Sequence, residues 1–235
     1  MKKKIKIDEY DSIIKYQSDD SDKLVLEFTD KLLVEDIDKK INVKGKGQLN
    51  KQISSFIYEY LEGFHVPTFY IKNLNEHELL VKNSVLYPME IVIYNVAFDE
   101  FSKRFQLEDM DQLNLPVTEY FLIKNDQRIM INMSHALAFC DIEPEDFRTI
   151  DRLSSKTNAV LKSLFMRRNL NLMRFALRFG KFNDQVIISN ELSLDNITFF
   201  NPDLEKVFKP QWNEKNSDEA QSYFEDLTNM ILKTR

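Results

Sequence analysis

The stretch GKGQLNKQISSFIYEYL, residues 45–61, carries the most regular apolar pattern of the chain. Apolar side chains recur there every three or four residues, so one face of a helix is apolar. The members of this face are Leu49, Ile53, Phe56, Ile57, Tyr60 and Leu61. Gly63 follows where a glycine commonly ends a helix. The pattern predicts an amphipathic helix that buries one face.

Short β-rich runs surround this helix, and they predict strands at 12–17, 23–29, 68–72, 78–85, 89–96 and 119–124. We expect the three runs between 68 and 96 to form an antiparallel meander. A long helix is predicted from Pro144 to about residue 168, a strand hairpin over 172–191, and a terminal helix from Ser217. Helices do not alternate regularly with strands, which favours an α+β fold over a doubly wound sheet.

Composition excludes several classes of protein. The 235 residues are 43% hydrophobic and 30% charged, enough for one large or two small folded domains. A net charge of −6 argues against a nucleic-acid binder. No apolar run approaches the roughly 20 residues of a membrane span, and no apolar segment follows the basic start as in a signal peptide. With a single cysteine, Cys140, the sequence predicts a cytoplasmic location and no membrane partner.

The number and spacing of the glycines and histidines limit which nucleotide and metal sites the chain can form. The four glycines cannot form a G-x-G-x-x-G or a P-loop motif, so side chains must hold the phosphates of any nucleotide. The three histidines lack the spacing of metal ligands, and no metal site is predicted from the residues.

Alternation along residues 172–179 predicts a strand with two different faces. Phe175, Leu177 and Phe179 share one face, and Arg174 and Arg178 share the other. The arginine face fits either a solvated surface with an ion pair or an anion site.

Eight motifs in sequence order resemble those of the SAICAR synthetase family. They are 45–54 (GKGQLNKQIS), 66–68 (VPT), 80–82 (LVK), 88–95 (PMEIVIYN), 103–104 (KR), 130–132 (MIN), 177–180 (LRFG) and 190–195 (NELSLD). The resemblance implies an α+β fold with a small N-terminal antiparallel β domain over 1–86 and a larger ATP-grasp-like domain over 87–235. It also implies a ligase that uses ATP and magnesium to join aspartate to carboxyaminoimidazole ribotide in purine biosynthesis.

The resemblance implies site residues that this chain retains. Those at nucleotide-binding positions are Lys82, Glu90, Lys124 and Glu191. Those at substrate-binding positions are Asn95, Lys103, Arg104, Ser193 and Asp195.

Other family site positions are substituted. Asp11 and Ile13 stand where the phosphate turn G-K-x-K has lysines, Tyr94 replaces the arginine of R-N, and Asp99 and Glu100 replace the following G-S pair. Arg174, Ala176 and Arg178 occupy the D, K and E positions of the family strand, while Asn190 replaces an aspartate and Thr198 an arginine.

The substitutions change the charge where the resemblance places the metal. Arg178 and Asn190 replace two carboxylates, so the local charge moves from about −2 to +1. A guanidinium about 4 Å from Mg²⁺ is repelled by roughly 8 kcal/mol at an effective dielectric constant near 20. We expect Arg178 to take over the role of the metal as a counter-charge, either pairing with Glu191 or meeting an anionic ligand.

Two functional hypotheses follow. The first is a catalytically degenerate member of the family that keeps the scaffold and binds a nucleotide, a small phosphorylated molecule or a protein partner, or retains no ligand at all. The alternative is an active ATP-dependent carboxylate–amine ligase with compensating site residues. The resemblance is also compatible with a homo-oligomer.

Overall fold

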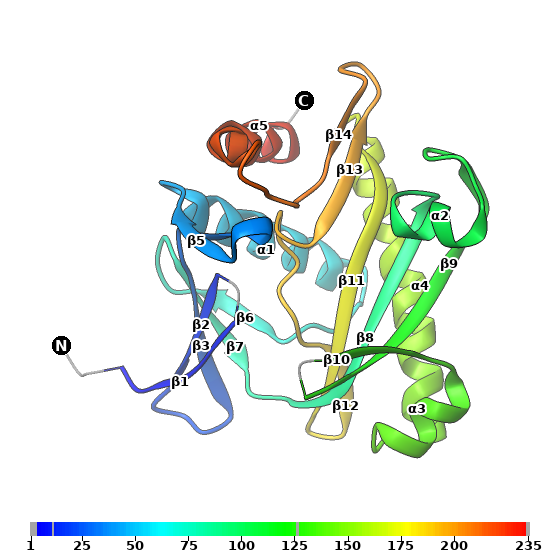
Figure 1. Cartoon of the computed structure of the whole chain (residues 1–235). Coiled ribbons are helices and arrows are strands. Elements are labelled where there is room, and N and C mark those ends of the chain that lie inside the picture. The colour runs from blue at the N-terminus through cyan, green and yellow to red at the C-terminus, as the bar shows by residue number, and fades with distance from the viewer. Residues whose placement is uncertain (1–3, 11, 126, 234–235) are drawn as a thin grey trace.

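The computed structural model describes residues 4–10, 12–125 and 127–233, which fold around two antiparallel sheets (Figure 1). The first sheet has the strand order β1-β2-β3-β7-β6. Its strands are β1 (Lys6–Tyr10), β2 (Ile13–Gln17), β3 (Lys23–Phe28), β6 (Tyr70–Asn73) and β7 (Glu78–Lys82). The predicted helix is α1 (Lys46–Gly63), which packs against β3, β6 and β7. Before it, β4 (Lys31–Val34), η1 (Glu35–Ile37) and β5 (Lys39–Asn42) form a small hairpin.

The second sheet has the order β10-β9-β8-β11-β13-β14, and β12 pairs with the end of β11. Its strands are β8 (Val85–Val96), β9 (Gln112–Lys124), β10 (Gln127–Ile131), β11 (Asn171–Phe182), β12 (Gln185–Ile188), β13 (Ile197–Asn201) and β14 (Lys206–Phe208). The remaining helices are α2 (Glu100–Phe105), α3 (Met133–Phe139), α4 (Pro144–Met166), η2 (Ser217–Glu219) and α5 (Ala220–Leu232). The long α4 runs behind β8 and β11, and α5 lies beside α1 (Figure 1).

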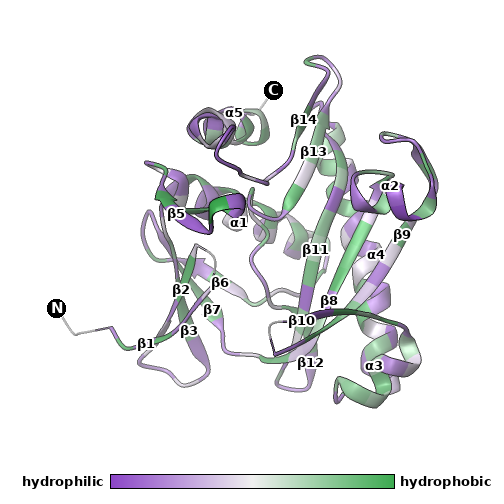
Figure 2. Cartoon of the chain, viewed as in Figure 1, coloured by the Kyte–Doolittle hydropathy of each residue, from purple (hydrophilic) through white to green (hydrophobic). Residues whose placement is uncertain are grey.

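Burial of apolar faces holds these layers together. Phe147, Ile150 and Leu161 of α4 are among the residues buried against the second sheet, and each such side chain contributes roughly 1.5–3 kcal/mol. The central strands β8 and β11 carry much of the hydrophobic colouring in Figure 2. One buried cluster includes residues of both sheets and of α1, α4 and α5. The division at residue 86 therefore stays a prediction.

The predicted meander over 68–96 is wrong in its last strand. Strand β7 already pairs with β3 on one edge and β6 on the other, so neither edge can accept β8. The chain instead crosses at Asn83 and Ser84 into the second sheet, where β8 lies between β9 and β11. The Ser84 hydroxyl donates to Ser189 Oγ at 2.8 Å, which ties this crossing to the end of β12.

Pro88 and Pro116 lie inside strands β8 and β9. Pro88 falls where the register of β8 against β11 shifts, between Glu90 and Leu86. Pro116 lies in the part of β9 that extends beyond the paired residues of β10, so that side of β9 is a sheet edge. Both places tolerate a residue without an N–H donor.

We predict that Gly47→Ala destabilises the protein. A Cβ atom at Gly47 would lie 2.4 Å from the backbone oxygen of Phe28, so α1 and β3 would have to separate. Such overpacking typically costs about 1–3 kcal/mol. Urea unfolding measures the loss.

Gly63→Ala is the matched control, because a Cβ atom there meets nothing within 4 Å. In a helix, alanine is favoured over glycine by up to about 1 kcal/mol. Equal stability of the two variants would contradict the close approach of α1 to β3.

Candidate functional site: a cleft between the second sheet and the N-terminal half

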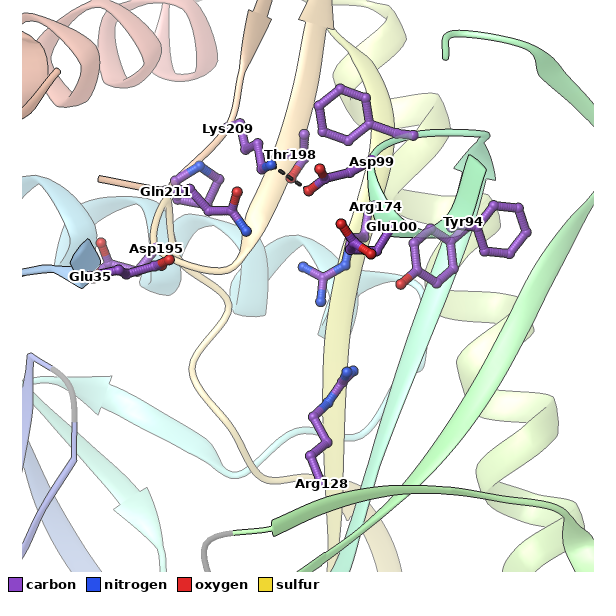
Figure 3. Close-up of a pocket in the computed structure, with 13 residues that line it drawn as sticks. Glu35, Tyr94, Asp99, Glu100, Arg128, Arg174, Asp195, Thr198, Lys209 and Gln211 are labelled. Carbon is purple, nitrogen blue, oxygen red and sulfur yellow. Dashed lines mark hydrogen bonds and ion pairs between the residues drawn. The ribbon is translucent and has the colours of Figure 1, made fainter. Parts of the chain in front are cut away.

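Two adjoining cavities of about 330 and 220 Å³ form a continuous cleft. Glu35, Asp195 and Pro210 line both of them. The larger cavity is bordered by β8, β11 and β13 of the second sheet, and the smaller by Ser12 and β4 of the N-terminal half. Figure 3 shows the side chains that line the larger cavity.

The arginine face of β11 forms one wall of the cleft. Arg174, Ala176 and Arg178 are partly exposed, whereas Phe175, Leu177 and Phe179 are buried, so the predicted two-faced strand is confirmed. Antiparallel register places Arg174 opposite Tyr94 of β8 and opposite Thr198 of β13. The three residues form a row across the sheet, which we call the Tyr94–Arg174–Thr198 row. The guanidinium carbon of Arg174 lies 5.8 Å from the centre of the Tyr94 ring.

Glu90 joins two arginines lower in the same cleft wall. The strand register pairs it directly with Arg178, whose Nη2 lies 3.7 Å from Glu90 Oε1. Arg128 donates from Nε to Glu90 Oε2 at 2.8 Å, and its guanidinium stacks 3.5 Å from the centre of the Phe121 ring. We expected Arg178 to pair with Glu191 or meet a ligand, but its ion pair is with Glu90. Its side chain is 41% exposed, so it is a half-solvated counter-charge.

The side-chain amide of Asn190 forms all its hydrogen bonds in the described structure with backbone groups. Its Oδ1 accepts from the Arg178 N–H at 2.7 Å, and its Nδ2 donates to the carbonyls of Ala176 at 3.3 Å and Glu191 at 2.8 Å. The amide therefore clamps the loop after β12 to β11. An aspartate at this position could not make the two donor bonds.

Glu191 accepts a hydrogen bond from the Tyr10 hydroxyl at 2.9 Å. Burial, and then the Glu191 charge, raise the pKa of Tyr10 well above its usual value. Tyr10 stays protonated and keeps donating at neutral pH, so Glu191 is held by β1 at the edge of the smaller cavity.

The residues at the expected magnesium position do not fit a magnesium ion. Mg²⁺ is normally held by oxygen ligands that include carboxylates. At this position the chain offers the Arg178 guanidinium and the Asn190 amide, whose oxygen is already bonded. Within residues 4–10, 12–125 and 127–233, no three histidine, cysteine, aspartate or glutamate side chains gather in a way that could hold a metal.

Asp195 connects the two halves of the chain through a single oxygen. Its Oδ2 accepts from Lys46 Nζ at 2.6 Å, from Asn50 Nδ2 at 2.8 Å and from Ser12 Oγ at 2.8 Å. Lys46 is 1% exposed and Asp195 is 23% exposed. Because an unpaired buried ammonium is costly, this pair positions α1 against the loop that carries Asp195.

The structure brings some of the predicted site residues to the cleft. Those that line it are Tyr94, Asp99, Glu100, Arg174, Glu191, Asp195 and Thr198. Asp99 pairs there with Lys209. Glu90 and Arg178 act at its wall as described above. Ala176 packs against an apolar cluster around Val92, and Ile13 is buried in the main core. Asp11 lies outside the described residues.

The other predicted site residues do not line either cavity. Lys82 donates to the Thr68 carbonyl at 2.8 Å, and Asn95 exchanges hydrogen bonds with Asn158 of α4 on the buried face. Lys103 pairs with Glu100 at 2.8 Å, and Arg104 pairs with Glu119. Ser193 Oγ accepts from the Asp195 N–H at 3.3 Å, and Lys124 ends β9.

Several lining residues were missed by the sequence reasoning: Glu35, Arg128, Lys209 and Gln211. These residues lie in short connections and in the hairpin formed by β9 and β10. Such segments have no regular spacing of apolar residues from which their structure could be predicted. The only signal in the sequence was that Arg128 follows closely after the predicted strand 119–124. That position does not show that the chain folds back there and brings Arg128 to Glu90 of β8.

These features define an α+β protein with a polar cleft between the second antiparallel sheet and the N-terminal half of the chain. The SAICAR synthetase family model matches residues 13–230, and the chain belongs to this family. The phosphoribosylaminoimidazole-succinocarboxamide synthase of Aquifex aeolicus is 36% identical over 204 residues, covering 84% of this chain and 92% of the relative. That of Acidithiobacillus ferrooxidans is 34% identical over 228 residues, covering 96% and 95%.

Solved structures agree with this assignment. The Ehrlichia chaffeensis phosphoribosylaminoimidazole-succinocarboxamide synthase superposes with a TM-score of 0.87 at 27% identity, covering 98% of this chain and 99% of that one. A SAICAR synthetase in complex with ADP gives 0.86 at 26% identity, covering 97% of each. The expected family and α+β fold are confirmed, and the family is one of ligases. None of the helices in the described part of the chain has the length and apolarity of a membrane span.

We predict that Asp195→Asn destabilises the protein by about 2–4 kcal/mol, because the Lys46 ammonium would stay buried without a countercharge. Lys46→Met in the Asp195→Asn background should restore part of the loss, since the two side chains act as one unit. Urea unfolding of the single and double variants measures this coupling.

Glu145→Gln provides the control, since Glu145 forms an exposed pair with Arg148 at 3.1 Å. Its effect should stay below about 0.5 kcal/mol. Additive effects of the Asp195 and Lys46 substitutions would show that the pair is not coupled.

Proposed function

We propose that this chain is a catalytically degenerate SAICAR-synthetase-family protein that binds a small phosphorylated anion in its cleft without a resident metal. The observation that carries the proposal is the pairing of Glu90 with both Arg128 and Arg178. The side-chain amide of the neighbouring Asn190 is fully hydrogen-bonded to backbone groups. Arg178 and the neutral Asn190 stand where, by the family resemblance, two carboxylates hold the metal.

The expected loss of reaction rate supports this proposal. Loss of one transition-state donor commonly lowers a rate by about 10²–10³. Here the charge changes at Tyr94, Arg174, Arg178 and Thr198 meet on neighbouring strands of one cleft. Effects of groups that act as a unit do not add simply, but several such losses together leave little room for the family reaction.

A second candidate is ATP-dependent carboxylate–amine ligation with compensating residues. The comparisons favour this candidate, since the relatives and structures described above carry synthase or synthetase names and one is a complex with ADP. Glu191 and Asp195 at the cleft also remain acidic. In that case the family substrates, ATP, aspartate and carboxyaminoimidazole ribotide, would be those of this chain.

The cellular setting belongs to the same proposal. We place the chain in the cytoplasm, where it binds a small phosphorylated molecule and neither nucleic acid nor a membrane, with a homo-oligomer as the assembly to look for.

We predict no aspartate-dependent ADP release when the purified chain is mixed with ATP, magnesium, aspartate and the ribotide, because Arg178 and Asn190 occupy the expected metal position, where a magnesium site needs carboxylates. A coupled ADP assay measures turnover, with the Aquifex aeolicus relative as the positive control. Calorimetry should give an ATP dissociation constant weaker than about 1 mM, or about −4 kcal/mol. ADP release that requires both aspartate and the ribotide would establish the second candidate.

We predict that Arg178→Glu combined with Asn190→Asp creates divalent-cation binding but no ligation. The pair would place two new carboxylates near Glu90 and Glu191, while Tyr94 and Thr198 stay unchanged. Manganese titration followed by electron paramagnetic resonance measures the binding. Arg178→Gln with Asn190 intact is the control and should bind no manganese.

Asn190→Asp also removes two donor bonds, so this variant should lose about 1–3 kcal/mol of stability. Circular dichroism at the titration temperature checks that it is folded. Turnover by the double variant would show that Tyr94 and Thr198 do not prevent the family reaction.

A further inference from the structure

Residues 98–109 form a compact loop between the end of β8 and the start of β9. Two backbone hydrogen bonds join its ends: the Met110 N–H donates to the Ala97 carbonyl at 2.9 Å, and the Ala97 N–H donates to the Asp111 carbonyl at 2.8 Å. The loop contains α2, whose six residues are too few to form a stable helix alone. A loop that is closed at its base in this way can move as one unit.

Asp99 begins this loop in a backbone conformation that glycine adopts far more easily than other residues. Its φ is 58° and its ψ is −129°, a combination that is strained for a residue with a side chain. By the family motif, this position is the glycine of the G-S pair. Met110, at the other end of the loop, also has a positive φ, of 77°. Such strain persists only where the surrounding structure holds the residue in place.

Hydrogen bonds inside the loop hold the Asp99 backbone. Its N–H donates to Asp109 Oδ1 at 3.0 Å. Its carbonyl accepts from Ser102 Oγ at 2.8 Å and from the Lys103 N–H at 3.1 Å. These bonds keep the shape of the loop, but they do not attach it to another part of the molecule.

The strands on either side of the loop provide its first attachment. Phe101 of α2 stacks on Tyr94 of β8 with 4.5 Å between the ring centres. Arg104 pairs with Glu119 of β9. Phe101 and Tyr94 belong to a small apolar cluster that is separate from the main core. The loop therefore rests on its own sheet without being part of the core.

Lys209 attaches the loop to a different wall of the larger cavity. Loop residues 98–101 and the segment 209–211, which follows β14, both line this cavity. The Lys209 ammonium pairs with the Asp99 carboxylate, as the dashed line in Figure 3 shows, and it lies 5.2 Å from the centre of the Phe98 ring. Lys209 thus holds the loop at the strained residue itself.

Burial makes this ion pair stronger than a surface pair. The side chains of Asp99 and Lys209 are 33% and 27% exposed, whereas Glu100 and Lys103, which pair on the same loop, are mostly exposed. Solvent screens an exposed pair almost completely and a half-buried pair less. The contact with Lys209 and the strain at Asp99 therefore act against each other at one residue.

We propose that residues 98–109 are a lid on the larger cavity and that Lys209 is the latch that holds the lid closed. The lid turns about its base at Ala97 and Met110, where a few residues absorb the change in backbone angles. While the latch is closed, the ion pair offsets the strain at Asp99. Once the pair breaks, the strain favours opening, and the cavity widens beside Phe98. The inference holds for both candidate functions, because it concerns access to the cavity and names no ligand.

Hydrogen exchange of the whole chain, read by mass spectrometry of the peptides that cover 98–109, measures the opening of the lid. We expect Lys209→Met and Asp99→Ala each to raise exchange of the lid amides at least about fivefold, the factor that corresponds to the lower end of such backbone strain. Both variants remove the latch and leave the strain in place. Lys209→Arg keeps the charge and should stay within about twofold of the wild type.

Comparing Asp99→Gly with Asp99→Ala isolates the strain. Both variants lack the carboxylate, but glycine adopts this conformation without strain. The lid of Asp99→Gly should therefore exchange at least about fivefold more slowly than that of Asp99→Ala. Without strain the order would reverse, since glycine is the more flexible residue in an ordinary loop.

Lys103→Met is the matched control, because it removes the exposed pair with Glu100 on the same loop. Its lid exchange should stay within about twofold of the wild type. Peptides of α4 provide the reference for global unfolding and should exchange equally in all variants. Trp212, the only tryptophan of the chain, is buried beside the segment that carries the latch. Acrylamide quenching of its fluorescence should be unchanged in Asp99→Ala, because the lid moves and this segment does not.

Three results would overturn the lid: exchange within twofold of the wild type in both Lys209→Met and Asp99→Ala, exchange in Asp99→Gly as fast as in Asp99→Ala, or an equal rise in the α4 peptides. Stronger quenching of Trp212 in Asp99→Ala would make the segment after β14 the moving part and reject the lid. Exchange is measured without any ligand, so the result of the ADP-release assay does not affect this test.

Discussion

The buried ion pair between Lys46 and Asp195 is the contact on which the cleft depends. Lys46 opens α1 with almost no exposure, so its ammonium must find an anion inside the protein. Asp195 supplies it from the loop between β12 and β13, and the same oxygen also accepts from Asn50 and Ser12. One carboxylate thereby joins the N-terminal sheet, the first helix and the second sheet, and it stands where the two cavities meet.

The second sheet explains how a site can change while its scaffold persists. Along β11, alternate side chains point to opposite faces. Phe175, Leu177 and Phe179 are almost completely buried and pack in the main core, which constrains their size and shape. Arg174 lines the cleft and Arg178 lies half-solvated on the same face beside Glu90, where solvent accommodates changes of charge. One face of β11 therefore keeps the family fold while the other face changes the chemistry of the site.

Sequence patterns predicted the elements with a clear apolar period well. Helices α1 and α4 and strands β2, β3 and β11 were found within a few residues, because each has an apolar period that spans several turns or pairs. Strands β1, β4, β5, β10, β13 and β14 and helices α2 and α3 were missed, and β9 was predicted only in its second half. They are short or polar, and tertiary pairing rather than local propensity stabilises them.

By itself the sequence determined the family, the α+β class, the two faces of β11 and the change of charge at positions 174, 178 and 190, since each depends on residue identity and local spacing. Only the tertiary structure decided which charges meet. Arg178 pairs with Glu90 because antiparallel register places them opposite each other, and Arg128 reaches the same carboxylate because the β9–β10 hairpin folds over Phe121. Partners that lie 38 or 88 positions apart in the chain leave no periodic signal, and strand register sets their contact.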